Sequence, residues 1–276
     1  DVDDNTRDVT TPLAASQDIE TSTVLHQESP EQVKAVYMTS WVAATPRLRD
    51  AVLDFVESTE VNALILDIKD STGKISFLVK DEYLASYGAD ENRIRNLDAF
   101  LADLHERGIY VIGRISVFQD PYLSVERPDL AVTNKSGSVW QDRKGLSFLH
   151  PAEEEVWQYT VALAREAYQR GFDEINFDYI RFPSDGDIAA IDYRLDEGQE
   201  RSDVIEEFFQ YLHRELKDNV EKPHEGMVIS ADLFGMTTSN YDDLGIGQIL
   251  EKAYPYFDYI APMVYPSHYP DGWNGF

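Results

Sequence analysis

The chain has 276 residues, 43% of them hydrophobic and 12% aromatic, which is enough to bury a substantial core and excludes general disorder. Its 51 acidic and 24 basic residues give a formal net charge of −27, which disfavours binding to nucleic acid or to anionic lipid. Cysteine is absent, which excludes thiolate zinc sites and cysteine nucleophiles, and no apolar run is long enough to predict membrane insertion of this chain.

The first 33 residues differ in composition from the rest of the chain. Up to Pro30 they are rich in Asp, Thr, Ser and Gln, contain no aromatic residue and show no sustained periodicity. We interpret residues 1–33 as a flexible acidic tether and residues 34–276 as one folded catalytic domain. Because the chain begins at Asp1 and not at Met, we expect an exported or cell-envelope location, with the signal or anchor segment absent from this chain.

After the predicted tether, short apolar runs alternate with longer amphipathic stretches. The apolar runs predict six strands, at residues 35–41, 63–69, 110–118, 174–180, 228–234 and 259–265. The amphipathic stretches predict helices at residues 46–58, 94–107, 151–169, 202–219 and 245–254. Thr45 and Pro46 are typical of a helix start, and Gly108 and Gly171 are typical of helix ends.

Strands that alternate with helices and carry near-continuous apolar runs are typical of a parallel sheet buried on both faces. The mean repeat of about 40 residues favours a TIM-type (β/α)8 barrel. A nucleotide-binding Rossmann fold is less well supported, because the sequence contains neither Gly-x-Gly-x-x-Gly after a strand nor a P-loop. The sixth predicted strand ends close to the end of the chain, so we expect a barrel truncated after about six β/α units, with two edge strands.

Alternate residues of a barrel strand point into the lumen, and those at the carboxyl ends of strands form the active-site face. In the fourth predicted strand, Ile175, Phe177 and Tyr179 would face the helices, so Asn176 and Asp178 would point into the lumen. The same alternation places further residues at lumen positions of the other strands: Asp67, Lys69, Arg114, Ser230, Asp232, Met263 and Tyr265, with Trp41 closing the first strand.

The residue types in this cluster limit the classes of reaction that it could catalyse. Buried charges are costly unless they are paired, and one alternative is a purely structural ion-pair network of Asp67 with Lys69 or Arg114. No His-Glu-x-x-His or Gly-x-Ser-x-Gly motif supports a metal hydrolase or a serine hydrolase. Two carboxyl groups on adjacent strands, Asp178 and Asp232, suit glycoside hydrolysis, which needs an ionised nucleophile or base and a protonated acid.

Substrate contacts are expected around this carboxylate pair. Aromatic rings stack on the apolar faces of sugars, and the candidates for such platforms are Trp41, Tyr37, Tyr265 and Trp140. Arg114 would hold Asp178 ionised, because a nearby cation favours the charged form. The remaining candidates for substrate binding are Asp67, Lys69, Asn176, Arg181, Met263 and His268, the last in the loop after the sixth strand.

The segment GFDEINFDYIRFPSDG, residues 171–186, resembles a motif of a bacterial domain-of-unknown-function family regarded as glycoside hydrolases. Further segments of this resemblance are VNALILDIKDSTG, YVIGRISVFQD, ISADLFGM and YIAPMVYPSHY, so that it extends from about Lys34 to the end of the chain. The resemblance implies a TIM-barrel, carbohydrate-active enzyme. More distantly, the first segment is similar to the strand-four motif of family 18 chitinases, but Ile180 stands where those enzymes have their acid. The α-amylase class is closer, with Asp178 at the position of its nucleophile.

We therefore predict a glycoside hydrolase that acts on a polysaccharide or oligosaccharide, with Asp178 as nucleophile and Asp232 as general acid/base. No cofactor and no metal are expected. Two alternatives remain open. One is a non-catalytic barrel that binds cell-envelope glycan through its aromatic residues, and the other is a metal-dependent polysaccharide deacetylase that uses Asp67 and His268.

Overall fold

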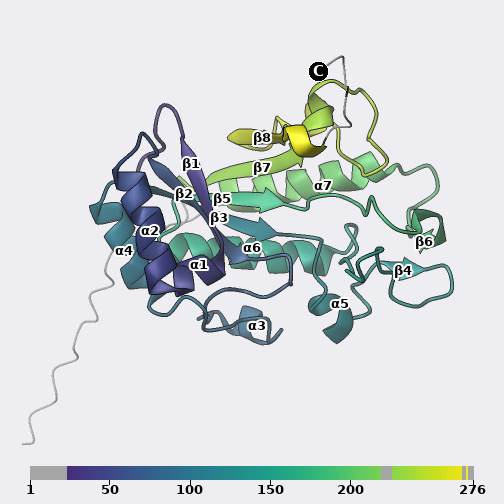
Figure 1. Ribbon diagram of the computed structural model, residues 1–276. Coiled ribbons are helices and arrows are strands. Elements are labelled where there is room, and N and C mark those ends of the chain that lie inside the picture. Colours follow the sequence, from purple (N-terminus) through teal and green to yellow (C-terminus); the bar gives the residue numbers. More distant parts are fainter. Residues whose placement is uncertain (1–23, 219–225, 269–271, 273–276) are drawn as a thin grey trace, which may run out of the picture.

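The computed structural model describes residues 24–218, 226–268 and 272. Its main sheet has six strands in the order β1-β2-β3-β5-β7-β8, and every pairing in it is parallel (Figure 1). The strands are β1 (Ala35–Met38), β2 (Ala63–Lys69), β3 (Tyr110–Ser116), β5 (Glu174–Asp178), β7 (Val228–Phe234) and β8 (Tyr259–Met263). This sheet confirms the predicted fold class, since its six parallel strands with intervening helices form part of a TIM-type barrel.

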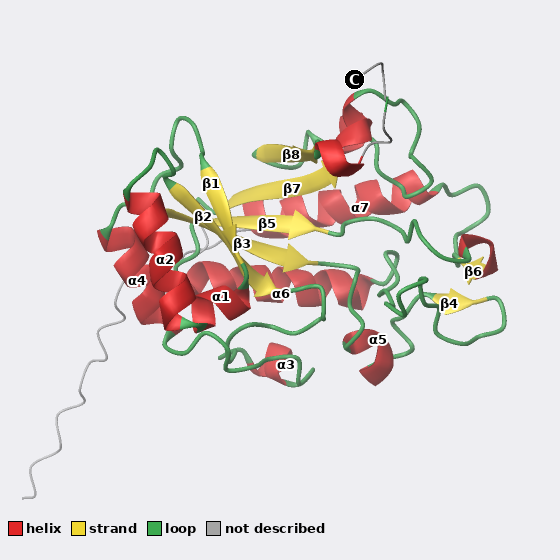
Figure 2. Cartoon of the chain, viewed as in Figure 1, coloured by secondary structure: helices red, strands yellow, loops and turns green. Residues whose placement is uncertain are grey.

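Helices connect the strands, and the longer ones pack along the outer face of the curved sheet. The α-helices are α1 (Ser40–Ala44), α2 (Pro46–Glu57), α3 (Glu82–Ala85), α4 (Leu97–Glu106), α5 (Leu123–Glu126), α6 (Glu154–Arg170), α7 (Arg201–His213) and α8 (Leu250–Ala253). Shorter turns are the 3-10 helices η1 (Ile188–Ala190), η3 (Gly235–Thr238) and η4 (Pro266–His268), and the π-helical turn η2 (Arg214–Asp218). Figure 2 shows that the loops after β3 and β5 meet beyond the sheet, where β4 (Thr133–Asn134) pairs antiparallel with β6 (Ile191–Asp192).

Local sequence explains where the main helices begin and end. Helix α2 begins with Pro46 directly after the extended residue Thr45, as predicted. Helix α6 has Glu154 and Glu155 in its first turn, where carboxylates interact favourably with the helix dipole. It ends at Gly171, whose φ of 117° is a conformation that glycine adopts without steric cost.

The two faces of the sheet are buried in different ways. Apolar strand residues that face the helices form the main core, and Ile115, Phe177 and Ile229 are fully buried there. Burial of a side chain as large as Phe177 contributes about 1.5–3 kcal/mol. The opposite face lines the lumen and carries a separate small apolar cluster around Tyr110 and Ile112. Polar side chains that alternate with the core residues therefore point into the lumen.

Four predicted strands are too long at their carboxyl ends, those that correspond to β1, β3, β5 and β8. The sequence predicts that Trp41 closes the first strand, but β1 ends at Met38 and Trp41 lies in α1. The hydroxyl of Thr39 accepts a hydrogen bond from the backbone N–H of Val42 and so caps this helix. Strand β8 similarly ends before Tyr265.

Residues 24–33, predicted as part of the tether, contact the amino-terminal end of the sheet. The backbone N–H of Gln27 donates to Oδ1 of Asp173 at 2.8 Å. The hydroxyl of Ser29 lies 3.1 Å from that of Tyr259, at the start of β8. These residues therefore form a docked segment, and the rest of the predicted tether lies outside the described residues.

Candidate active site

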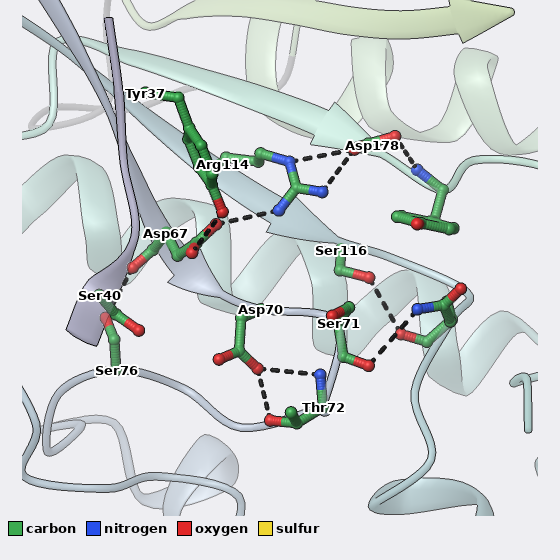
Figure 3. A network of polar contacts seen from close by, with 12 residues as sticks. Tyr37, Ser40, Asp67, Asp70, Ser71, Thr72, Ser76, Arg114, Ser116 and Asp178 are labelled. Carbon is green, nitrogen blue, oxygen red and sulfur yellow. Dashed lines mark hydrogen bonds and ion pairs between the residues drawn. The ribbon is translucent and has the colours of Figure 1, made fainter. Parts of the chain in front are cut away.

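A network of hydrogen bonds and ion pairs joins three strands on the lumen face (Figure 3). Arg114 of β3 lies between Asp67 of β2 and Asp178 of β5. Its Nη1 donates to Oδ1 of Asp67 at 2.9 Å, while its Nε and Nη2 donate to Oδ2 of Asp178 at 3.0 and 2.6 Å. Burial opposes the charge of Arg114, but the two carboxylates outweigh it and raise its pKa. Arg114 therefore holds Asp178 as an oriented carboxylate.

Asp67 lies beneath this arginine and is only 2% exposed. Its second oxygen accepts a hydrogen bond from the hydroxyl of Tyr37 at 2.8 Å. Burial raises the pKa of Asp67, against the opposing effect of these hydrogen bonds. Because both carboxylate oxygens are bonded to protein groups, Asp67 fixes the position of Arg114.

Asp178 is the last residue of β5, and the chain turns sharply after it. Its Oδ1 accepts a hydrogen bond from the backbone N–H of Tyr179 at 2.6 Å. Tyr179 has a φ of 53°, in the left-handed region that non-glycine residues rarely adopt and that often marks functional sites. The sequence predicts that Tyr179 faces the helices, but β5 ends one residue earlier and Tyr179 instead lines a cavity beside Asp178.

Asp232 of β7 points into the lumen from the neighbouring strand and is half-buried. Its Oδ1 accepts a hydrogen bond at 3.1 Å from Nδ2 of Asn176, which also lies 3.1 Å from the hydroxyl of Ser230. Burial, and then the negative charge of Asp178, raise the pKa of Asp232 to about 7. A carboxyl group of this kind retains its proton at near-neutral pH and can act as an acid.

Two cavities, each of about 340 Å³, share Tyr179 and Arg181, and Asp178 lines the first of them. The first is lined by Asp178, Tyr179, Arg181, Phe234, Gly235, Met236 and Met263. The second is more polar, and its lining includes Ser71, Gln119, Asp142, Lys144, Ser184 and Asp185. Their shared residues make them two parts of one cleft, of a size that suits small ligands.

Lys69 does not face the lumen, contrary to the predicted alternation. Asp67 pairs with Arg114, but the register then shifts, so that Lys69 pairs with Ile115. This bulge turns Lys69 toward the helices, where it is fully buried with its Nζ 2.5 Å from Oδ2 of Asp120. The predictions that Lys69 contacts substrate or pairs with Asp67 were therefore wrong.

Of the four predicted aromatic platforms, Tyr37 donates a hydrogen bond to Asp67, and the other three lie in different settings. Trp41, on α1, lies against Arg93, whose guanidinium carbon is 4.5 Å from the ring centre, and it lines a different cavity from that of Asp178. Trp140 is 1% exposed and donates from Nε1 to the carbonyl oxygen of Asp187, so its predicted role as a platform was wrong. Tyr265 is about half exposed beyond β8.

The remaining predicted contact, His268, is the last residue of η4, and its side chain lies outside what the structure describes. Within the described ranges, no group of three or more His, Asp or Glu side chains is placed to share a metal ion. In the same part of the chain, no helix combines the length and the apolar composition that a membrane crossing requires.

Four residues that line the first cavity were not predicted from the sequence. Phe234 continues the inward alternation of Ser230 and Asp232, so the pattern was sufficient to find it. Gly235 and Met236 lie in η3, and Tyr179 depends on an unusual backbone conformation that no pattern in the sequence indicates.

The family model described as "Putative glycosyl hydrolase domain" matches residues 35–276. Among solved structures, a hypothetical protein from Ruminiclostridium thermocellum is 32% identical with a TM-score of 0.63, over 76% of this chain and 98% of that one. The α-galactosidase TtGalA from Thermus thermophilus, in complex with stachyose, is 15% identical with a TM-score of 0.51, over 86% of this chain and 45% of that one. A chitobiase from Flavobacterium johnsoniae is 12% identical with a TM-score of 0.50, over 87% of this chain and 41% of that one. The last two show similarity of fold alone. A comparison with curated proteins finds no match.

Proposed function

The chain belongs to the family of glycosyl hydrolase domains whose model it matches, and we propose that it hydrolyses glycosidic bonds of a polysaccharide or oligosaccharide with Asp178 and Asp232. The contrast between these two carboxyl groups carries the proposal. Arg114 binds Asp178 as a carboxylate, whereas the pKa of Asp232 is raised to about 7. Glycoside hydrolysis uses such a pair, in which one group is ionised and the other carries a proton.

In the proposed mechanism, Asp232 donates its proton to the glycosidic oxygen, and the C1–O bond breaks with its electron pair leaving on that oxygen. Asp178 attacks C1 and forms a glycosyl ester. A water molecule then loses a proton to Asp232 and adds to C1, which releases the sugar and restores both carboxyl groups. The backbone N–H of Tyr179 and the guanidinium of Arg114 hold Asp178 in one orientation throughout.

The cleft supports this assignment, because Asp178 lies in the wall of a cavity that has apolar and aromatic sides. Tyr179, Phe234 and Met263 supply surfaces on which a sugar ring can pack. Asp178 is thus positioned to meet a ring held in that cavity.

Asp178→Asn tests the proposal directly. We expect a loss of about 10²–10⁴-fold in kcat, because an amide cannot act as the nucleophile. The measurement is the release of reducing ends from a panel of polysaccharides. Asp54→Asn is the matched control, since it removes the same charge from the exposed side of α2. Turnover by Asp178→Asn at the rate of the unchanged protein would refute the assignment.

Asp232→Asn separates the two roles. The variant should lose kcat/KM on natural linkages but retain most of its kcat/KM on dinitrophenyl glycosides, whose leaving group departs without a proton. Its kcat should fall on both kinds of substrate, because hydrolysis of the glycosyl ester still needs Asp232 as the base. Equal losses of kcat/KM on both kinds of substrate would contradict an acid role for Asp232. Saccharide binding without turnover by the unchanged protein would instead favour the glycan-binding alternative.

A further inference from the structure

Arg181 lies in the cleft, three residues beyond the end of β5, and its guanidinium is held in place. The guanidinium carbon lies 4.9 Å from the ring centre of Phe234 and 5.4 Å from that of Tyr179. Nη1 donates to the carbonyl oxygen of Phe182 at 3.0 Å and to the hydroxyl of Ser184 at 3.1 Å. Nε and Nη2 form no hydrogen bond to the described residues. These two nitrogens are the fork that binds a carboxylate through two parallel hydrogen bonds.

Arg181 differs from the other substantially buried arginines of the described chain. Arg93 and Arg114 each contact two carboxylates. Arg181, by contrast, has no carboxylate within ion-pair distance among the described residues. Burial lowers its pKa by disfavouring its charge, and the nearby Tyr179 and Asp178 offset this only in part. An unpaired cation in a partly buried position is costly to a protein, and a ligand that supplies the missing negative charge would offset this cost.

The second cavity contains another cation, Lys144, that forms no ion pair with the described residues. The two acidic residues of this cavity, Asp142 and Asp185, already have protein partners. Asp142 accepts hydrogen bonds from backbone N–H groups of its own turn, and Asp185 lies 3.5 Å from Arg143. The cations on this side of the cleft that form no ion pair with the described residues are therefore Arg181 and Lys144.

We propose that Arg181 binds an anionic substituent of the saccharide, a carboxylate or a sulfate on the sugar ring, so that the substrate is an acidic glycan. This inference rests on the proposed function, since Arg181 lines the same cavity as Asp178. The net charge of −27 repels anions from the molecule as a whole. Selective binding of an acidic sugar therefore needs a local cation, and Arg181 supplies it.

Titration calorimetry with matched oligosaccharides tests the inference. The acidic probes are oligogalacturonate, oligoglucuronate and a sulfated oligogalactan, and the neutral probes are an oligogalactan and a cello-oligosaccharide. We expect an acidic probe to bind at least about tenfold more tightly than its neutral partner, and Arg181→Gln to remove this difference. Arg181→Lys retains the positive charge but not the two parallel N–H donors, so it should retain part of this difference in affinity.

Arg143→Gln is the matched control, because it removes one positive charge from an exposed position close by, in the connection between β4 and α6. Circular dichroism establishes that each variant is folded. The inference is overturned if no acidic probe binds, if neutral probes bind as tightly, or if Arg143→Gln weakens acidic probes as much as Arg181→Gln does. Arg181-dependent binding without cleavage would retain the inference and refute the proposed function. Cleavage of neutral glycans that depends on Asp178 and not on Arg181 would retain the proposed function and refute the inference.

Discussion

The protonation state of Asp232 controls the chemistry at the scale of single residues. An acid catalyst must carry its proton, and the pKa of Asp232 is raised to about 7. Activity should therefore be high below about pH 7 and fall as the pH rises through that value. The measurement is kcat/KM from about pH 5 to about pH 9. Activity that rises steadily across this range would contradict the assignment of Asp232 as the acid.

The same carboxyl group also affects stability. An unfolded Asp has a pKa of about 3.9, so the folded state holds this proton more tightly, and the contribution of Asp232 to stability falls as the pH rises from about 4 to about 7. The side chain of Asp232→Asn does not ionise, so the variant does not lose stability in this way as the pH rises. At pH 8 the variant should be more stable than the unchanged protein by on the order of 2 kcal/mol, with little difference near pH 4. Urea unfolding at the two pH values measures this, and identical differences at both would contradict it.

Arg114 connects the carboxylates of β2 and β5, so its effects belong to the scale of elements. Arg114→Met leaves Asp67 and Asp178 without their shared cation. We expect a loss of about 3 kcal/mol in the free energy of unfolding, measured with urea at neutral pH. Arg107→Met is the control, because Arg107 also contacts two carboxylates but does so on the surface, and it should cost far less.

Adding Asp67→Asn to Arg114→Met should restore part of the lost stability, because it removes one of the two unpaired charges. A double variant less stable than Arg114→Met would show that Asp67 does not depend on this cation.

Sequence patterns predicted which segments form strands more accurately than they predicted where those strands end. The limits of β2 and β7 agree with the prediction, and their carboxyl ends are followed directly by Asp70 and Gly235, residue types that are depleted in strands. Aromatic residues such as Trp41 extended the predictions too far, since their strand propensity was outweighed by helix capping at Thr39. Alternation correctly placed Asp178, Asp232 and Arg114 on one face of the sheet. It failed at Lys69 because a single bulge reverses the alternation.

The net charge governs the behaviour of the whole molecule. With 51 acidic and 24 basic residues, repulsion between carboxylates opposes the compact state. Salt screens this repulsion over about 10 Å at 0.1 M and more strongly at higher concentration. We therefore expect the melting temperature to rise when sodium chloride is added, as measured by scanning calorimetry, and to rise equally with potassium chloride. A fall in melting temperature would show that favourable ion pairs dominate.

The docked segment at the amino-terminal end of the sheet has a consequence for the order of folding. The contact between Ser29 and Tyr259 joins residues 230 positions apart, and that of Gln27 with Asp173 joins residues 146 apart. Loops this long are closed late, because local contacts and neighbouring strands form at a smaller cost in entropy. The surface that receives Ser29 is complete only when β3 and β8 belong to one sheet. The docked segment should therefore be the last part of the described chain to acquire its native contacts, and its backbone amides will report whether the sheet has assembled.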